Sequence, residues 1–111
     1  MKIANKYLEA IALTIQAFQI KDEQAFPVSG LLHEEISLGL KRKLQKIRTE
    51  VLAKLEELEK DKKEVGENVE EMKVLMEEEV EINQEYASLE MIENINTKFN
   101  YDFEVIEKFA K

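Results

Sequence analysis

A single apolar stripe constrains the fold of this chain more than any other feature. Between residues 36 and 58, apolar side chains advance 22 positions in six steps, a mean spacing of about 3.67. They are Ile36, Leu40, Leu44, Ile47, Val51, Leu55 and Leu58. This spacing matches a nearly straight α-helix better than the period of about 3.5 that winds a left-handed coiled coil. We therefore expect one long helix over residues 31–65, roughly 34 residues and about 50 Å long.

The segment before this helix predicts a second, shorter helix. Residues 3–20 carry apolar side chains at steps of three and four, which is the pattern of an amphipathic helix with a broad buried face. Residues 21–30 interrupt the pattern with charges and then with Pro27, which favours a loop. Either Ser29 or Gly30 is suited to cap the long helix.

The segment after the long helix predicts a third helix that folds back on it. Gly66 is suited to end the long helix, and Asn68 followed by Glu71 resembles a capping box. These signals place a helix over residues 69–79, antiparallel to the distal end of the long helix.

The C-terminal part, residues 80–111, is expected to form short elements that dock on the body. Residues 79–83 alternate between polar and apolar, as in a very short β-strand, although a helical continuation fits nearly as well. Two short helices follow at about 88–97 and 102–110, with Asp102 as the cap of the second. The sequence thus predicts a single all-α domain over residues 1–111, with at most one short β segment.

Composition excludes several classes of function. The chain has 111 residues, a formal net charge of −8 and no cysteine. Without cysteine there is no disulfide framework or thiolate metal site, and a reducing compartment, the cytoplasm, is expected. No apolar run is long enough for a membrane span, and no signal peptide is expected. The negative charge repels phosphate, so we expect protein partners and neither nucleic acid nor membrane.

Five basic residues lie together near the start of the long helix. This basic cluster consists of Lys41, Arg42, Lys43, Lys46 and Arg48. Successive residues on a helix lie about 100° apart, so the cluster surrounds the polar side of the helix. Only Gln45 stands beside the charges as a base-reading side chain, which favours a solvated or ion-pairing face. Nucleic-acid binding through the cluster is an alternative.

Acidic residues concentrate further along the chain. Residues 64–93 contain eleven acidic residues and one basic residue, and within them lies an acidic cluster of Glu77, Glu78, Glu79 and Glu81. The helix over residues 69–79 is too short to reach the basic cluster. Either residues 80–93 continue back along the long helix, or the acidic segment of one copy meets the basic cluster of another. The carboxylates have no metal-ligand spacing, so no metal site is expected.

The residues that usually carry catalysis are too few for an active site. His33 is the only histidine, and with Ser29 as its nearest hydroxyl it completes no acid, base and nucleophile set. No glycine-rich phosphate loop is present. We therefore expect no enzymatic activity, no cofactor and no small-molecule substrate.

Two segments, AFPVSGLLHEEISLGLKRKLQKIR and MEEEVEI, lie at either end of the long charged helix. In this order they resemble segments of a group of short helical proteins encoded by tailed bacteriophages and prophages. The resemblance covers most of the chain and implies a phage origin without a defined activity. Our leading hypothesis is a non-enzymatic protein-binding component of the virion, its assembly or an accessory function, as a monomer or homo-oligomer. The alternative is an inhibitor of a host defence nuclease, with an acidic surface that imitates DNA.

Overall fold

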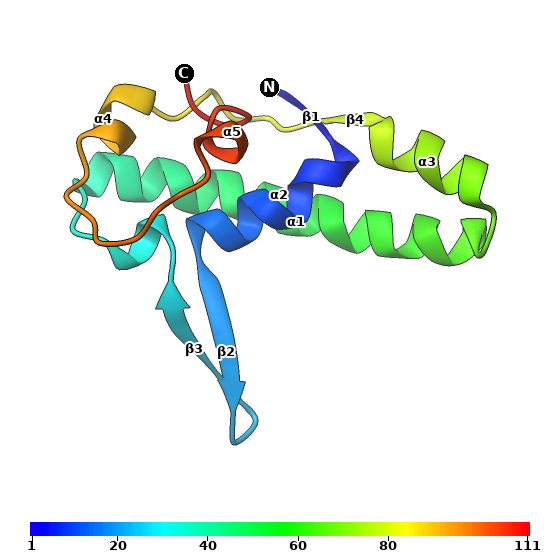
Figure 1. Cartoon of the computed structure of the whole chain (residues 1–111), viewed down its shortest axis with the longest axis horizontal. Coiled ribbons are helices and arrows are strands. Elements are labelled where there is room, and N and C mark those ends of the chain that lie inside the picture. Colours follow the sequence, from blue (N-terminus) through cyan, green and yellow to red (C-terminus); the bar gives the residue numbers. More distant parts are fainter.

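Two small antiparallel sheets accompany the helices in the computed structural model, which describes residues 1–111 (Figure 1). About 54% of the chain is helical and 17% is strand, so the all-α prediction is wrong and the fold is α+β. One sheet pairs β1 (Lys2–Ala4) with β4 (Glu79–Glu81). The other is a hairpin of β2 (Ala17–Lys21) and β3 (Gln24–Ser29).

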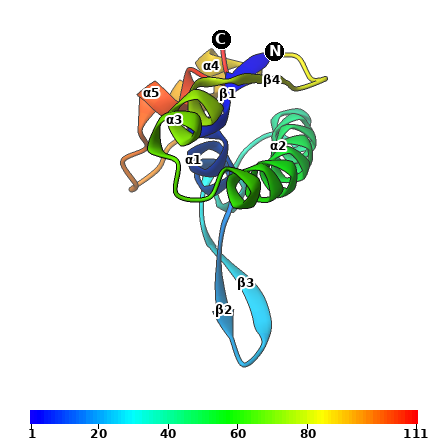
Figure 2. The same ribbon diagram turned by 90° about the vertical axis from the view of Figure 1, so that its right-hand side faces the viewer.

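Helices form the body of the molecule. In chain order they are α1 (Asn5–Ile15), the 3-10 turn η1 (Leu31–His33), α2 (Leu38–Val65), α3 (Val69–Glu77), α4 (Leu89–Glu93) and α5 (Phe103–Ile106). The helix α1 packs on α2 and α5 packs on α1, while α3 folds back beside the distal part of α2 (Figures 1 and 2). None of these helices combines the length and the apolar character needed to cross a bilayer.

The helix α2 buries the stripe that the sequence predicts, apart from Ile36, which precedes the helix. Of its members, Leu40, Leu44, Ile47, Val51 and Leu58 are buried, and the other two are half-buried. They belong to one core cluster with the apolar side chains of α1. The prediction of a long amphipathic helix that buries this stripe is confirmed.

The predicted helix over residues 3–20 is wrong at both ends. It is divided into β1, α1 and β2, and the predicted loop over residues 21–30 contains β3. Ile3 belongs to the paired strand β1, and the residues after Ile15 alternate as a strand does. The long helix also begins later than predicted, because Ser37 caps it: the Ser37 hydroxyl accepts a hydrogen bond from the Leu40 N–H at 3.3 Å.

The C-terminal half follows the predicted order with shorter helices. Asn68 caps α3 by accepting a hydrogen bond from the Glu71 N–H at 3.1 Å, and Gly66 ends α2 with a φ of 62°. The alternating segment is the strand β4, paired with β1. In place of the predicted helices over residues 88–97 and 102–110, the structure has only the shorter α4 and α5. The residues after α5 leave the helix because they hydrogen-bond the backbone at Ala87 and Leu89.

The root of the hairpin is a tight backbone junction formed by Gln16, Ser29 and Gly30. Gly30 has a φ of +119°, and a Cβ there would lie 2.6 Å from the Ile15 carbonyl oxygen and 2.8 Å from the Gln16 Cα. The buried Gln16 side chain donates a hydrogen bond from Nε2 to the Ser29 carbonyl at 2.8 Å. Only glycine fits this position, and the junction sets the direction in which the hairpin leaves the body.

The C-terminal loop is fastened to the same region by one carboxylate. Glu34 Oε1 accepts hydrogen bonds from the Tyr101 hydroxyl at 2.9 Å and the Thr97 hydroxyl at 2.6 Å. Burial and, next to it, the hydrogen bond to the Glu34 carboxylate together raise the pKa of Tyr101 to about 12. The folded state therefore requires a neutral Tyr101.

We expect Gly30→Ala to lower the free energy of unfolding by about 2–4 kcal/mol, since a left-handed backbone and a clash with main-chain atoms both oppose the methyl group. Gly39→Ala is the matched control: no atom lies within 4 Å of a Cβ there, and the position is helical. That control should be neutral or stabilise by up to about 1 kcal/mol. Urea unfolding measures both. Equal effects of the two variants would contradict the close approach at Gly30.

We expect Tyr101 to make stability depend on alkaline pH. Its folded pKa of about 12 lies above the ordinary value of 10.0, so its contribution is complete below about pH 10 and is lost as the pH rises toward 12. Urea midpoints should therefore fall more steeply between about pH 10 and 12 in the wild type than in Tyr101→Phe. Parallel curves for the two proteins would show that Tyr101 is not buried against Glu34.

Candidate functional site

The β2–β3 hairpin projects away from the helical body, as Figures 1 and 2 both show. All residues from 18 to 28 are exposed. Large apolar side chains are among them: Ile20 is 79% exposed, Phe26 47% and Phe18 46%. An arm that holds such side chains in water is a feature of interaction surfaces in proteins.

The tip of the hairpin carries two carboxylates on a constrained backbone. Asp22 and Glu23 have φ values of 53° and 63°, the combination that a two-residue type I′ turn requires. Glycine and asparagine usually occupy such positions, because other side chains adopt positive φ at a cost. Neither carboxylate has an ion-pair or hydrogen-bond partner in the chain.

The strand register gives the hairpin one apolar face. Phe18 pairs with Pro27 and Ile20 with Ala25, and residues that pair directly share a face. These four residues are the apolar face of the hairpin. Val28 lies at a bulge, between the pairs of Ala17 with Ser29 and of Phe18 with Pro27.

A cleft of about 560 Å³ separates the apolar face from α2. Its lining residues are Gln16, Phe18, Pro27, Leu32, His33, Lys41, Gln45, Arg48 and Thr49. Two of them are cationic and none is acidic. His33, the only histidine, lies on the wall of this cleft, and its side chain takes part in no hydrogen bond. We call this site the hairpin cleft.

Arg48 is the most unusual side chain of the hairpin cleft. The centre of its guanidinium lies 5.0 Å from the centroid of the Phe18 ring. Its Nε is buried and has no hydrogen-bond partner. Desolvation lowers the pKa of Arg48 from its ordinary value, but a guanidinium keeps its charge at neutral pH. A buried N–H without an acceptor is costly, so this donor is available to an acceptor that enters the cleft.

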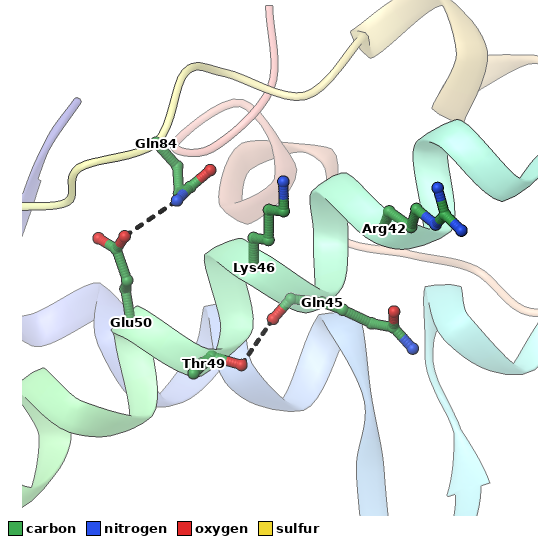
Figure 3. Close-up of a pocket in the computed structure, with 6 residues that line it drawn as sticks. All are labelled: Arg42, Gln45, Lys46, Thr49, Glu50 and Gln84. Atoms are coloured by element: carbon green, nitrogen blue, oxygen red, sulfur yellow. Dashed lines mark hydrogen bonds between the residues drawn. The ribbon is translucent and has the colours of Figure 1, made fainter.

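The structure divides the basic cluster between two neighbouring depressions along α2, which share Gln45 and Thr49. Lys41 and Arg48 face the hairpin cleft, whereas Arg42 and Lys46 line a second depression of about 480 Å³ (Figure 3). Lys43 lines neither. None of the four ion pairs in the structure includes a member of the cluster. The cluster therefore has no carboxylate partner within one copy of the chain.

Glu50, which lines the second depression, has a structural role. Its Oε2 accepts a hydrogen bond from the Asn83 N–H at 2.6 Å, and its Oε1 accepts one from Gln84 Nε2 at 3.0 Å (Figure 3). These bonds fasten the segment after β4 to α2. The only sequence signal for this role is that Glu50 is a single acidic residue just after a basic run.

The acidic cluster lies apart from the basic cluster. Glu77 pairs with Lys6 at 2.9 Å and Glu81 with the amino group of Met1 at 3.6 Å, while Glu78 and Glu79 form no ion pair. All four are exposed. Residues 80–93 do run back toward the start of α2 (Figure 1), but their carboxylates do not reach the basic cluster. Nowhere do three His, Asp or Glu side chains gather as metal ligands.

In comparisons with known proteins, no family model, curated protein or solved structure matches the chain.

Proposed function

We propose that this chain is a non-enzymatic protein-binding protein that holds an acidic, extended segment of a protein partner in the hairpin cleft. The observation that carries the proposal is Arg48, whose charge has no carboxylate partner and whose buried Nε has no acceptor. A carboxylate matches both needs, because it accepts charge-assisted hydrogen bonds from a guanidinium.

The apolar face favours an extended peptide as the occupant. Phe18 and Pro27 form one wall of the cleft, and Ile20 continues that wall toward the tip. Apolar side chains of a bound segment would cover this wall while acidic ones meet Arg48 and Lys41 on α2. A segment that alternates between the two kinds of side chain suits such a cleft, because side chains of an extended chain point alternately to opposite sides.

Nucleic acid is a poorer match for the same surface. The net charge of −8 opposes the approach of a phosphate backbone. Only Lys41 and Arg48 of the basic cluster face the cleft, and Arg42 and Lys46 line the neighbouring depression. A duplex is usually held by a continuous row of cations, which this surface lacks.

The hairpin cleft would be the binding surface for the protein-binding role that the sequence suggested. A phage assembly component or accessory protein needs a stable body and an accessible binding element, and here these are the helical body and the hairpin arm. The reducing interior of a cell suits a chain without cysteine. A nuclease inhibitor acting through the acidic cluster has less support, since Glu77 and Glu81 are already paired.

We expect a fluorescein-labelled peptide of alternating valine and glutamate to bind the wild-type chain, measured by fluorescence anisotropy. Arg48→Ala should weaken binding about tenfold to a hundredfold, the worth of a charge-assisted hydrogen bond of about 1.5–3 kcal/mol. Arg42→Ala is the matched control, because it removes the same charge from the neighbouring depression, which Arg42 lines and Arg48 does not. It should change the affinity by less than about threefold.

Three results would contradict the proposal. One is equal loss of affinity in the two arginine variants, which would mean that net charge alone controls binding. Another is equal binding of a peptide that alternates valine and lysine. The third is tighter binding of a duplex oligonucleotide with a steep dependence on salt, which would support nucleic-acid recognition instead. Circular dichroism of each variant shows whether it has kept its fold.

A further inference from the structure

The two outer edges of the hairpin differ in their capacity to pair with another strand. Successive pairs in an antiparallel ladder alternate between those that exchange hydrogen bonds and those that point their backbone groups outward. Pro27 has no N–H, so the pair that it forms with Phe18 belongs to the outward-pointing kind. Pro27 therefore removes a donor from the free edge of β3, which is a known way to protect an edge.

The free edge of β2 has no such protection. The alternation that Pro27 fixes makes Ile20 with Ala25 the other outward-pointing pair. Phe18 and Ile20 thus direct their N–H and carbonyl groups away from β3. An exposed edge flanked by apolar side chains invites a further strand.

We propose that the occupant of this edge is the β2 edge of a second copy of the chain. The two hairpins would pair antiparallel about a two-fold axis at Gln19, with Phe18 of each copy opposite Ile20 of the other. The inference rests on the proposed function of the hairpin cleft. The acidic segment that the cleft receives would be the hairpin tip of the second copy.

Hydrogen-bonding requirements favour this register. A shift that places Ile20 opposite Gln16 of the other copy would require the Gln16 N–H, which already donates to the Ala12 carbonyl at 3.0 Å. A shift in the other direction places Phe18 opposite Asp22, where the backbone has left the strand conformation. With Gln19 on the axis, the outward groups of Phe18 and Ile20 in both copies find partners, and the two apolar faces form one continuous surface.

Charge complementarity identifies the second copy as the occupant. In this register Asp22 of one copy lies opposite Gln16 of the other, and Gln16 lines the hairpin cleft. The unpaired carboxylates of Asp22 and Glu23 would therefore approach the unpaired cations Lys41 and Arg48. Each cleft is completed by the hairpin tip of its partner, which supplies the acceptor that Arg48 Nε lacks.

A cysteine introduced at Gln19 tests the register directly, because the chain has none of its own. Residues opposite each other in a pair that exchanges no hydrogen bonds have Cα atoms about 4.5 Å apart, within the range that a disulfide spans. Gln19→Cys should therefore form a covalent dimer rapidly under mild oxidation. Val28→Cys is the matched control, exposed on the protected strand β3, and it should crosslink much more slowly. Equal rates, or no dimer from Gln19→Cys, would overturn the proposal.

Removal of the tip charges tests the second part of the proposal. Asp22→Asn combined with Glu23→Gly gives the Asn-Gly pair that type I′ turns prefer, so the hairpin should stay folded while both carboxylates are lost. Sedimentation velocity over a wide range of concentrations should show a reversible dimer for the wild type and a dissociation constant about tenfold larger for the variant. A wild-type chain that stays monomeric, or an unchanged constant in the variant, would overturn the proposal.

Peptide binding to the wild type tests the proposed function separately from self-association. The valine–glutamate peptide should compete with the hairpin tip and shift the wild type from dimer to monomer. If the wild type is monomeric and still binds the peptide through Arg48, the cleft is a binding site and self-association is wrong. If neither dimer nor peptide binding is found, both proposals fail.

Discussion

The close approach of Gly30 to the backbone of Ile15 and Gln16 is the constraint on which the rest of the structure depends. At this point the chain returns from the hairpin to the body, and a Cβ would overlap main-chain atoms. The buried Gln16 amide closes the same junction by bonding the Ser29 carbonyl. Because α1 ends here and η1 begins here, the junction fixes the hairpin relative to α1 and α2. The hairpin cleft exists only because that direction is fixed.

The helical body serves as a rigid support for this cleft. The apolar stripe of α2 packs on α1, and the polar side of the same helix presents Lys41 and Arg48 toward the hairpin. Glu50 and Glu34 fasten two C-terminal segments to the body through hydrogen bonds with Asn83, Gln84, Thr97 and Tyr101. These two carboxylates are thus occupied by structural bonds, and no ion pair of the chain engages the cations of the basic cluster.

The sequence predicted the parts of the fold that follow from local periodicity. The stripe of α2, the caps at Asn68 and Asp102 and the strand β4 all have local signals, and the structure contains them. The hairpin was missed because Asp22 and Glu23 lack the glycine or asparagine that usually marks a type I′ turn, and because Phe18 continues the helical spacing of Ile11 and Ile15. The basic cluster was recognised because its residues lie close together in the sequence. Its division between two depressions depends on where the hairpin lies, so it could not be predicted. Pairing of β1 with β4 depends on a contact between distant segments, which no local pattern indicates.

The central claim is that Arg48 offers an unpartnered donor to an incoming carboxylate. The chain contains only two arginines, Arg42 and Arg48, so an NMR spectrum of ¹⁵N-labelled protein has one probe and one internal control among the Nε–H signals. We predict that, when the valine–glutamate peptide is added to the Asp22→Asn, Glu23→Gly variant, whose hairpin tip carries no carboxylate, the Arg48 Nε–H signal shifts strongly downfield and is protected from exchange, while the Arg42 signal stays in place. An unchanged Arg48 signal at saturating peptide, or equal shifts of both signals, would contradict this account.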